Sequence, residues 1–142
     1  MSSNQENISN FGQQDQNAPD VLNIDQEPSL LLALDKAESL VKNLYESWRC
    51  QIVGNKNFAI FIDNNDAIWN VSRAGFIKLL DHLETSIPST THIMMCFNKF
   101  KTFDLLAGVP RALHCIGFKT VHPDNYPLEI DSSEYLVMVL KI

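Results

Sequence analysis

The chain has 142 residues, 45% of them hydrophobic, so it can form one domain around a single hydrophobic core. No apolar run approaches the roughly 18 residues of a membrane-spanning helix. The N-terminus also lacks the basic and apolar regions of a secretory signal. We therefore expect no membrane insertion.

The negative charge of the chain is concentrated at its N-terminus. Residues 1–28 contain five of the 17 acidic residues and no Lys or Arg, which leaves 12 acids and 11 bases in residues 29–142. The longer segment has no basic patch that would indicate a nucleic-acid partner. Because residues 1–28 are polar and have little apolar surface to bury, we expect them to be disordered and residues 29–142 to form the domain.

The first half of this domain is expected to contain a helix, a strand and a second helix. Apolar residues at helical spacing favour a helix over 35–47, whereas residues 30–34 fit either a helix or a buried strand. The run "KNFAIFID" predicts a strand, and the "DNND" at its end is typical of a turn. Ser72 is a suitable N-cap for a helix that continues to about Ser86.

The second half begins with "THIMMCF", which predicts a strand buried on both faces. The helical pattern that follows contains Gly108 and Pro110, which predict a kink, or two short helices with Pro110 in the first turn of the second. Gly117 fits a left-handed C-cap, with Phe118 packing back on the helix. Two more strands are predicted at "FKTV" and "EYLVMVLKI".

This order of elements predicts an α/β fold of the α+β type, with a mixed parallel and antiparallel sheet and two main helices. Each strand–helix–strand unit predicts a parallel pair with a right-handed crossover. The loop before the last strand is long enough for that strand to return antiparallel. The stretch "RALHCIGFKTVHP" resembles the helix-to-strand crossing of acetyltransferases, so an acetyltransferase-like enzyme is one interpretation.

An acetyltransferase would bind the pyrophosphate of coenzyme A through backbone N–H groups at a glycine-rich turn. The five glycines are far apart, and the segment "MMCFNKFKTFD", where such a turn would lie, contains none. We therefore expect no cofactor, with a divergent acetyl-CoA site as the alternative.

No other catalytic or metal-binding arrangement stands out. In a strand, His92 and Cys96 would lie roughly 13 Å apart, beyond the reach of a nucleophile and its base. No paired ligands occur at zinc spacing. The odd number of cysteines and the missing secretory signal indicate free thiols in a reducing compartment: Cys50, Cys96 and Cys115.

One flank of the helix over 72–86 carries two acids, Asp81 and Glu84, with Ile77 beside them. An ordinary solvated helix flank would look like this. A protein-docking face, in which two acids border an apolar contact, would look the same. The residues alone leave both interpretations open.

From Trp48 onward, several spaced motifs together resemble the ornithine decarboxylase antizyme family. No single motif is specific, but their order and spacing over 95 residues match the family pattern. The motifs are "SWR", "NFAIFID", "FIKLLDHLE", "HIMMCFNK", "LHCIGFKTVHP" and "EYLVMVL".

The resemblance implies an acetyltransferase-like fold without acetyltransferase activity, in a non-catalytic inhibitor. Members of the family bind the ornithine decarboxylase subunit as a 1:1 heterodimer and thereby disrupt its active homodimer, whose active sites lie across the dimer interface. They deliver the subunit to the proteasome without ubiquitin, restrain polyamine uptake and bind the decoy protein antizyme inhibitor. Their synthesis needs a polyamine-stimulated ribosomal frameshift. The resemblance also implies a cytoplasmic location, with the nucleus as a second compartment.

The resemblance further implies which residues bind the partner. Arg73 stands where the family has a lysine, so the charge is kept while the donor geometry changes. Two family glutamates correspond to Asp81 and Glu84, and a third to the uncharged Thr85. Together with Ile77 on the same flank, the residues expected to bind the partner are Arg73, Ile77, Asp81, Glu84, Lys99 and Val121.

Overall fold

The computed structural model describes residues 27–65, 71–102 and 104–142. The chain divides into two compact units, Met1–Leu32 and Ala33–Ile142. Most of the segment predicted to be disordered lies outside the described residues. Within the described part, the first helix already begins at Glu27. None of the described helices is long and apolar enough to cross a membrane.

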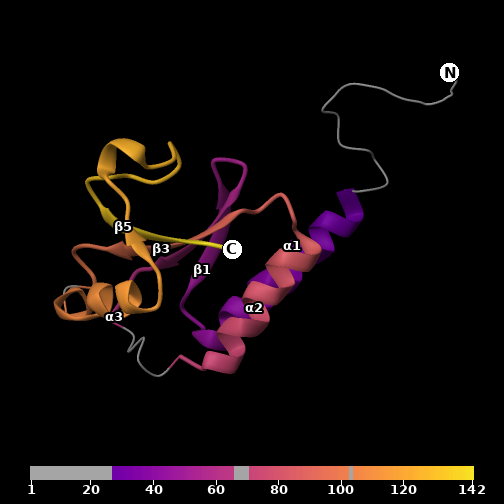
Figure 1. Cartoon of the computed structure of the whole chain (residues 1–142), viewed down its shortest axis with the longest axis horizontal. Helices are drawn as coiled ribbons and strands as arrows, with labels where there is room; N and C mark the ends of the chain where they lie inside the picture. The colour runs from indigo at the N-terminus through magenta and orange to yellow at the C-terminus, as the bar shows by residue number, and fades with distance from the viewer. Residues whose placement is uncertain (1–26, 66–70, 103) are drawn as a thin grey trace, which may run out of the picture. The chain divides into compact units, whose positions relative to one another are not determined.

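The second unit contains a five-stranded mixed sheet with α-helices beside it (Figure 1). A mixed α/β fold was predicted from the sequence and is confirmed. The elements in chain order are α1 (Glu27–Leu44), β1 (Arg49–Val53), β2 (Asn57–Ile62), α2 (Arg73–Ser86), β3 (His92–Asn98), η3 (Leu105–Ala107), α3 (Val109–Cys115), β4 (Lys119–Thr120), η4 (Pro123–Asn125) and β5 (Tyr135–Lys141).

The strands are arranged in the order β1-β2-β3-β5-β4. The predicted parallel pair of β2 and β3 is present, and β5 returns antiparallel as expected. The second strand–helix–strand unit, however, gives no adjacent parallel pair, because β5 inserts between β3 and β4. All seven residues of β5 pair with β3, whereas β4 contains only two residues. Strand β5 therefore forms more backbone hydrogen bonds with β3 than β4 could, and it occupies the position next to β3.

Strand β1 has no counterpart in the sequence prediction. It forms an antiparallel hairpin with β2, and Val53 pairs with Asn57 across the turn. Gly54 and Asn55 both have positive φ angles, 58° and 68°, as hairpin turns of the primed types require. The Gly-Asn pair is therefore the local signal that marks this hairpin.

The helix boundaries follow local signals closely. Residues 30–34, which fit either a helix or a strand, are helical, and α1 ends at Leu44 rather than at residue 47. The Ser72 hydroxyl accepts a hydrogen bond from the Gly75 amide at 3.0 Å and caps α2 as predicted. Around Pro110 the sequence predicted either a kink or two short helices, and the described residues form the second alternative, η3 and α3, with Pro110 in the first turn of α3.

The sheet separates two apolar layers, because side chains alternate along each strand. One side, here the helical face, carries Met95, which lines a cleft together with residues of α2 and α3. The other side, here the loop face, carries a buried cluster that includes Phe61, Cys96 and Val137. The segment between β4 and β5 covers this cluster with three side chains, Val121, Tyr126 and Ile130.

Candidate partner-binding site

Four of the six residues predicted to bind a partner form one stripe along α2. Arg73, Ile77, Asp81 and Glu84 follow one another at spacings of four, four and three residues, which places them on one side of a helix. All four are exposed, and Ile77 keeps 50% of its surface accessible. The opposite side of α2 is anchored by Leu79 and Leu83, which are fully buried. The structure thus presents the four residues, here the α2 stripe, on a firmly packed helix.

The charges of the α2 stripe run against the helix dipole. Anions stabilise the N-terminus of a helix and cations the C-terminus. In α2 the first residue is the cation Arg73, the anion Glu84 lies in the last turn, and no acid in the first turn or base in the last turn compensates. The described residues contain two ion pairs, Arg49–Asp63 and the one within 122–124, and neither involves the stripe. Arg73 and Glu84 are therefore not placed to stabilise α2 itself, either through the helix dipole or through an ion pair with a described residue.

Helix α1, from Ala33 onward, lies beside α2 and holds it in place (Figure 1). The His82 ring nitrogen Nε2 bonds to the Ala33 carbonyl oxygen at 2.8 Å. The Thr85 hydroxyl donates to the Asp81 carbonyl oxygen at 2.8 Å, within the same helix. Where the family resemblance places a third glutamate, this chain therefore has a side chain that is already bonded to its own backbone.

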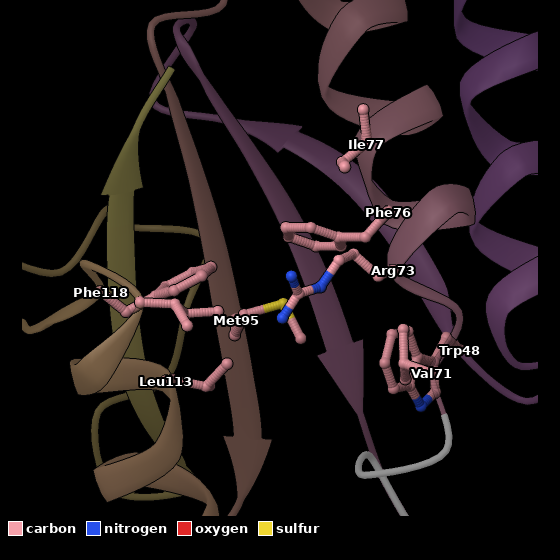
Figure 2. A pocket seen from close by; sticks show the side chains of 9 residues that line it. Trp48, Val71, Arg73, Phe76, Ile77, Met95, Leu113 and Phe118 are labelled. Carbon is pink, nitrogen blue, oxygen red and sulfur yellow. The ribbon is translucent and has the colours of Figure 1, made fainter.

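An apolar cleft opens between α2 and α3 and is here called the α2–α3 cleft (Figure 2). Its volume is about 210 Å³. The rings of Phe76 on α2 and Phe118 after α3 lie 6.4 Å apart and connect its two walls. The lining residues include the buried Trp48, Met95, Leu113 and Phe118, the half-buried Val71 and Phe76, and the exposed Arg73, Ile77 and Ile116.

The position of Phe118 depends on the glycine before it. Gly117 adopts a φ of 110°, a conformation that side-chain-bearing residues rarely take. The Gly117 amide donates to the His114 carbonyl at 3.1 Å and the Phe118 amide to the Leu113 carbonyl at 3.0 Å. The chain turns sharply after α3 as a result, and Phe118 is fully buried against the helical face, as predicted.

Lys99 follows β3 and is held by the turn that precedes β5. Its ammonium donates to the Ser132 carbonyl at 3.0 Å, and its amide donates to the Glu134 carbonyl at 2.8 Å. The side chain is half-buried. An ammonium has three donors, so this internal bond leaves two for a partner.

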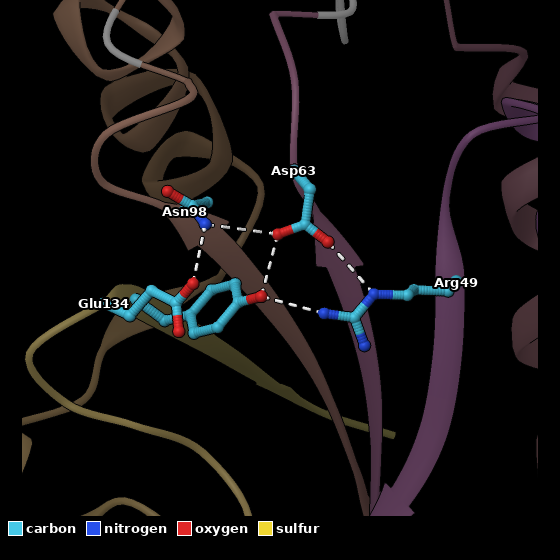
Figure 3. A network of polar contacts seen from close by, with 5 residues as sticks. Arg49, Asp63, Asn98 and Glu134 are labelled. Atoms are coloured by element: carbon cyan, nitrogen blue, oxygen red, sulfur yellow. Dashed lines mark hydrogen bonds and ion pairs between the residues drawn. The ribbon is translucent and has the colours of Figure 1, made fainter.

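A polar network fixes the end of the sheet next to Lys99 (Figure 3). The Asp63 carboxylate accepts from Arg49 Nε at 3.0 Å and from the Tyr135 hydroxyl at 2.8 Å. Arg49 Nη2 also donates to the Tyr135 hydroxyl at 2.8 Å, and Asn98 Nδ2 donates to Glu134 at 3.1 Å. Burial, followed by the bond to Asp63, raises the pKa of Tyr135 to about 12, so its hydroxyl keeps its proton. The sequence did not predict this network, because its members lie at the ends of four strands (β1, β2, β3 and β5) that are distant in the chain.

Asn98 also determines what the turn after β3 can bind. Its Oδ1 accepts from the backbone amides of Phe100 and Lys101 at 3.0 and 3.1 Å. A pyrophosphate cradle needs free amides at this crossing. Because the side chain of Asn98 already bonds these two, the geometry gives no support to the alternative acetyl-CoA site.

Val121 lies apart from the α2 stripe. It is half-buried and packs on the loop-face cluster, and its amide donates to the Val137 carbonyl at 3.0 Å. Because α2 packs on the helical face, the sheet lies between Val121 and the α2 stripe. The six residues predicted to bind a partner therefore occupy three places: the α2 stripe, the turn after β3 and the loop face.

The surroundings of Cys50 and Cys96 do not activate these thiols as nucleophiles. All three are free thiols. Burial raises the pKa of Cys50 to about 11 and that of Cys96 to about 12, which disfavours the reactive thiolate. Within the described ranges, no group of three His, Cys, Asp or Glu side chains is placed to hold a metal ion.

Comparisons with known proteins point to a single family. The family model described as "Ornithine decarboxylase antizyme" matches residues 30–142. The chain is 33% identical over 106 residues to the ornithine decarboxylase antizyme of Onchocerca volvulus, covering 75% of this chain and 70% of the relative. It is 24% identical over 108 residues to that of Caenorhabditis elegans, covering 76% and 67%. It is 26% identical over 106 residues to that of Pristionchus pacificus, covering 75% and 73%.

Proposed function

Because the chain belongs to the ornithine decarboxylase antizyme family, we propose that it acts by binding the ornithine decarboxylase subunit through the α2 stripe, and not by catalysis. The observation that carries this proposal is the charge arrangement of α2. Arg73 and Glu84 lie at the wrong ends of the helix for its dipole and have no ion-pair partners among the described residues. Charges that stabilise neither their own helix nor an ion pair with a described residue are expected to act in a complex.

The stripe specifies the surface that would match it. A base begins it, an apolar side chain lies near its middle, and two acids end it. A complementary partner surface would present an acid, an apolar side chain and a base in the same order. Electrostatic matching of this kind fixes the register of two surfaces and excludes wrong partners more than it adds affinity.

The proposed mechanism is competition for the free decarboxylase subunit. A ligand that binds only the separated subunit draws the homodimer apart by mass action. If the active sites lie across the homodimer interface, as the family resemblance implies, a 1:1 heterodimer is inactive. We further propose the other family roles for this chain: delivery of the subunit to the proteasome, restraint of polyamine uptake, and competition by antizyme inhibitor for the same stripe. The corresponding location is the cytoplasm, with the nucleus as a second compartment.

Lys99 and Val121 are proposed as secondary contacts. Lys99 lies on a rigid turn and keeps two free donors, so it suits a partner that reaches this end of the sheet. Val121 lies on the loop face, so a contact there requires the partner to extend around the sheet edge.

An inhibition titration tests the proposal. Purified ornithine decarboxylase is titrated with this chain while carbon dioxide release is measured. Inhibition should be complete near one chain per subunit. Full decarboxylase activity at a tenfold molar excess of the chain would contradict the proposed function.

A further inference from the structure

The α2–α3 cleft contains apolar surface that the fold itself does not cover. Ile77 on one bank keeps 50% of its surface exposed, and Ile116 on the other bank keeps 60%. Single exposed aliphatic residues are common and need no explanation. Ile77 and Ile116, however, line the same apolar cleft from opposite sides. Together with the buried residues at the bottom of the cleft, they form one continuous apolar patch, which is not common on a folded surface.

The shape of the cleft favours a single inserted side chain. Pockets for whole small molecules usually have volumes of about 300–1,000 Å³. The α2–α3 cleft measures about 210 Å³, below that range. Its walls are fixed, because Phe76 and Phe118 contact each other and Phe118 is fully buried. Rigid apolar pockets of this size are typical of the anchor positions that dominate binding energy at protein interfaces.

Charge defines what lies next to the anchor. The Arg73 side chain extends from the start of α2 across the cleft in Figure 2, and it forms no ion pair within the described part of the chain. An arginine fork on an apolar rim selects a carboxylate. In the other direction along α2, Asp81 and Glu84 select a base.

We propose that the α2–α3 cleft is the anchor pocket of the interface and accepts one large apolar side chain of the ornithine decarboxylase subunit. The segment that carries this side chain has an acid on the side that faces Arg73 and a base on the side that faces the two acids of α2. This inference rests on the proposed function and extends it, because it assigns Ile116, the residue after α3, to the interface, and the family resemblance implied no contact at that residue.

Ile116 is the residue that distinguishes this inference from binding by the α2 stripe alone. It lies on the α3 bank, outside the stripe. Its exposure allows Ile116→Ser without loss of a buried contact. Leu128→Ser is a matched control, because Leu128 is fully exposed at 102% and does not line the cleft. Circular dichroism melting of both variants checks that the fold is unchanged.

The test measures the affinity of each variant for the purified decarboxylase subunit by titration calorimetry at low and high salt. Ile116→Ser should raise Kd about tenfold at both salt concentrations, as loss of an apolar hot-spot contact does. Leu128→Ser should stay within twofold of the unchanged chain. On the opposite bank, Ile77→Ser should weaken binding in the same way as Ile116→Ser.

Two other results would overturn the inference, and they differ in what they leave standing. If Ile116→Ser binds as tightly as the unchanged chain while reversal of the α2 acids weakens binding, the cleft is outside the interface and the proposed function stands. If the unchanged chain does not bind the subunit at all, the inference and the proposed function are both wrong.

Discussion

Reversing the two acids of α2, in the double variant Asp81→Lys/Glu84→Lys, is expected to weaken binding to the ornithine decarboxylase subunit while the chain stays folded. Both side chains are exposed and form no ion pair within the described residues. The substitution therefore breaks no ion pair among the described residues. Its effect on binding reports what the two acids meet in the complex.

The size of the effect follows from the exposure of the two acids. An exposed ion pair contributes about 0.2–1 kcal/mol, and reversing one charge replaces this attraction with a similar repulsion. For two residues the expected loss is about 1–4 kcal/mol, which corresponds to a rise in Kd of roughly fivefold to nearly a thousandfold. The loss should shrink with added salt, because exposed charges are screened.

Stability should respond differently from affinity. Lysine at position 84 places a cation in the last turn of α2, where the helix dipole favours it by about 0.3–1 kcal/mol. Lysine at position 81 adds a cation to the groove that already contains Lys36 and Lys78, which costs a few tenths of a kcal/mol. The free energy of unfolding should therefore change by less than about 1 kcal/mol.

The matched control is Asp35→Lys/Glu38→Lys on α1. These two exposed acids have the same spacing, and their reversal changes the net charge by the same amount. Affinity is measured by calorimetry and stability by urea unfolding. The reasoning is refuted if the α2 variant binds within twofold of the unchanged chain, or if the α1 variant loses as much affinity.

Three further predictions concern the fold and the thiols. Tyr135→Phe removes the hydroxyl that bonds Asp63, and it should lower the free energy of unfolding in urea by about 1–3 kcal/mol; an unchanged unfolding midpoint would contradict the role of the network. The pKa values of Cys50 and Cys96 are raised from 9.0 to about 11 and about 12, so the folded chain holds these protons more tightly than the unfolded chain. The two thiols should therefore contribute their full stabilisation below pH 9 and lose it as the pH rises through 11 and 12. An equal melting temperature at pH 8 and pH 11 would contradict this pH dependence. Iodoacetamide at pH 8 should modify the exposed Cys115 long before the other two thiols, as measured by mass spectrometry of the intact chain and its peptides; rapid labelling of Cys96 would contradict the packing of the loop face.

Local signals in the sequence were sufficient for several elements. Ser72 predicted the start of α2 because an N-cap acts on amides within its own turn. Gly108, Pro110 and Gly117 predicted the interrupted helix and its end for the same reason, since backbone restrictions act within a few residues. The Gly-Asn turn after β1 was an equally local signal, and that hairpin could have been predicted.

Features that depend on contacts between distant parts of the chain could not be predicted from local sequence signals. Strand β5 inserts between β3 and β4 because it is longer than β4 and pairs with β3 over more residues. The α2–α3 cleft exists only because α3 packs on the same face of the sheet as α2. The stripe on α2 lies between these cases: helical spacing brings Arg73, Ile77 and Glu84 to one side. The absence of ion-pair partners for its charges among the described residues becomes visible only when the neighbouring elements are in place.

The most direct test of the proposed function is the mass of the complex formed with ornithine decarboxylase. The purified decarboxylase homodimer is mixed with an excess of this chain and separated by size-exclusion chromatography with light scattering, and decarboxylase activity is measured across the peak. We expect the homodimer to be replaced by an inactive species with the mass of one decarboxylase subunit and one copy of this chain. An intact, active homodimer eluting separately from the chain would contradict the account.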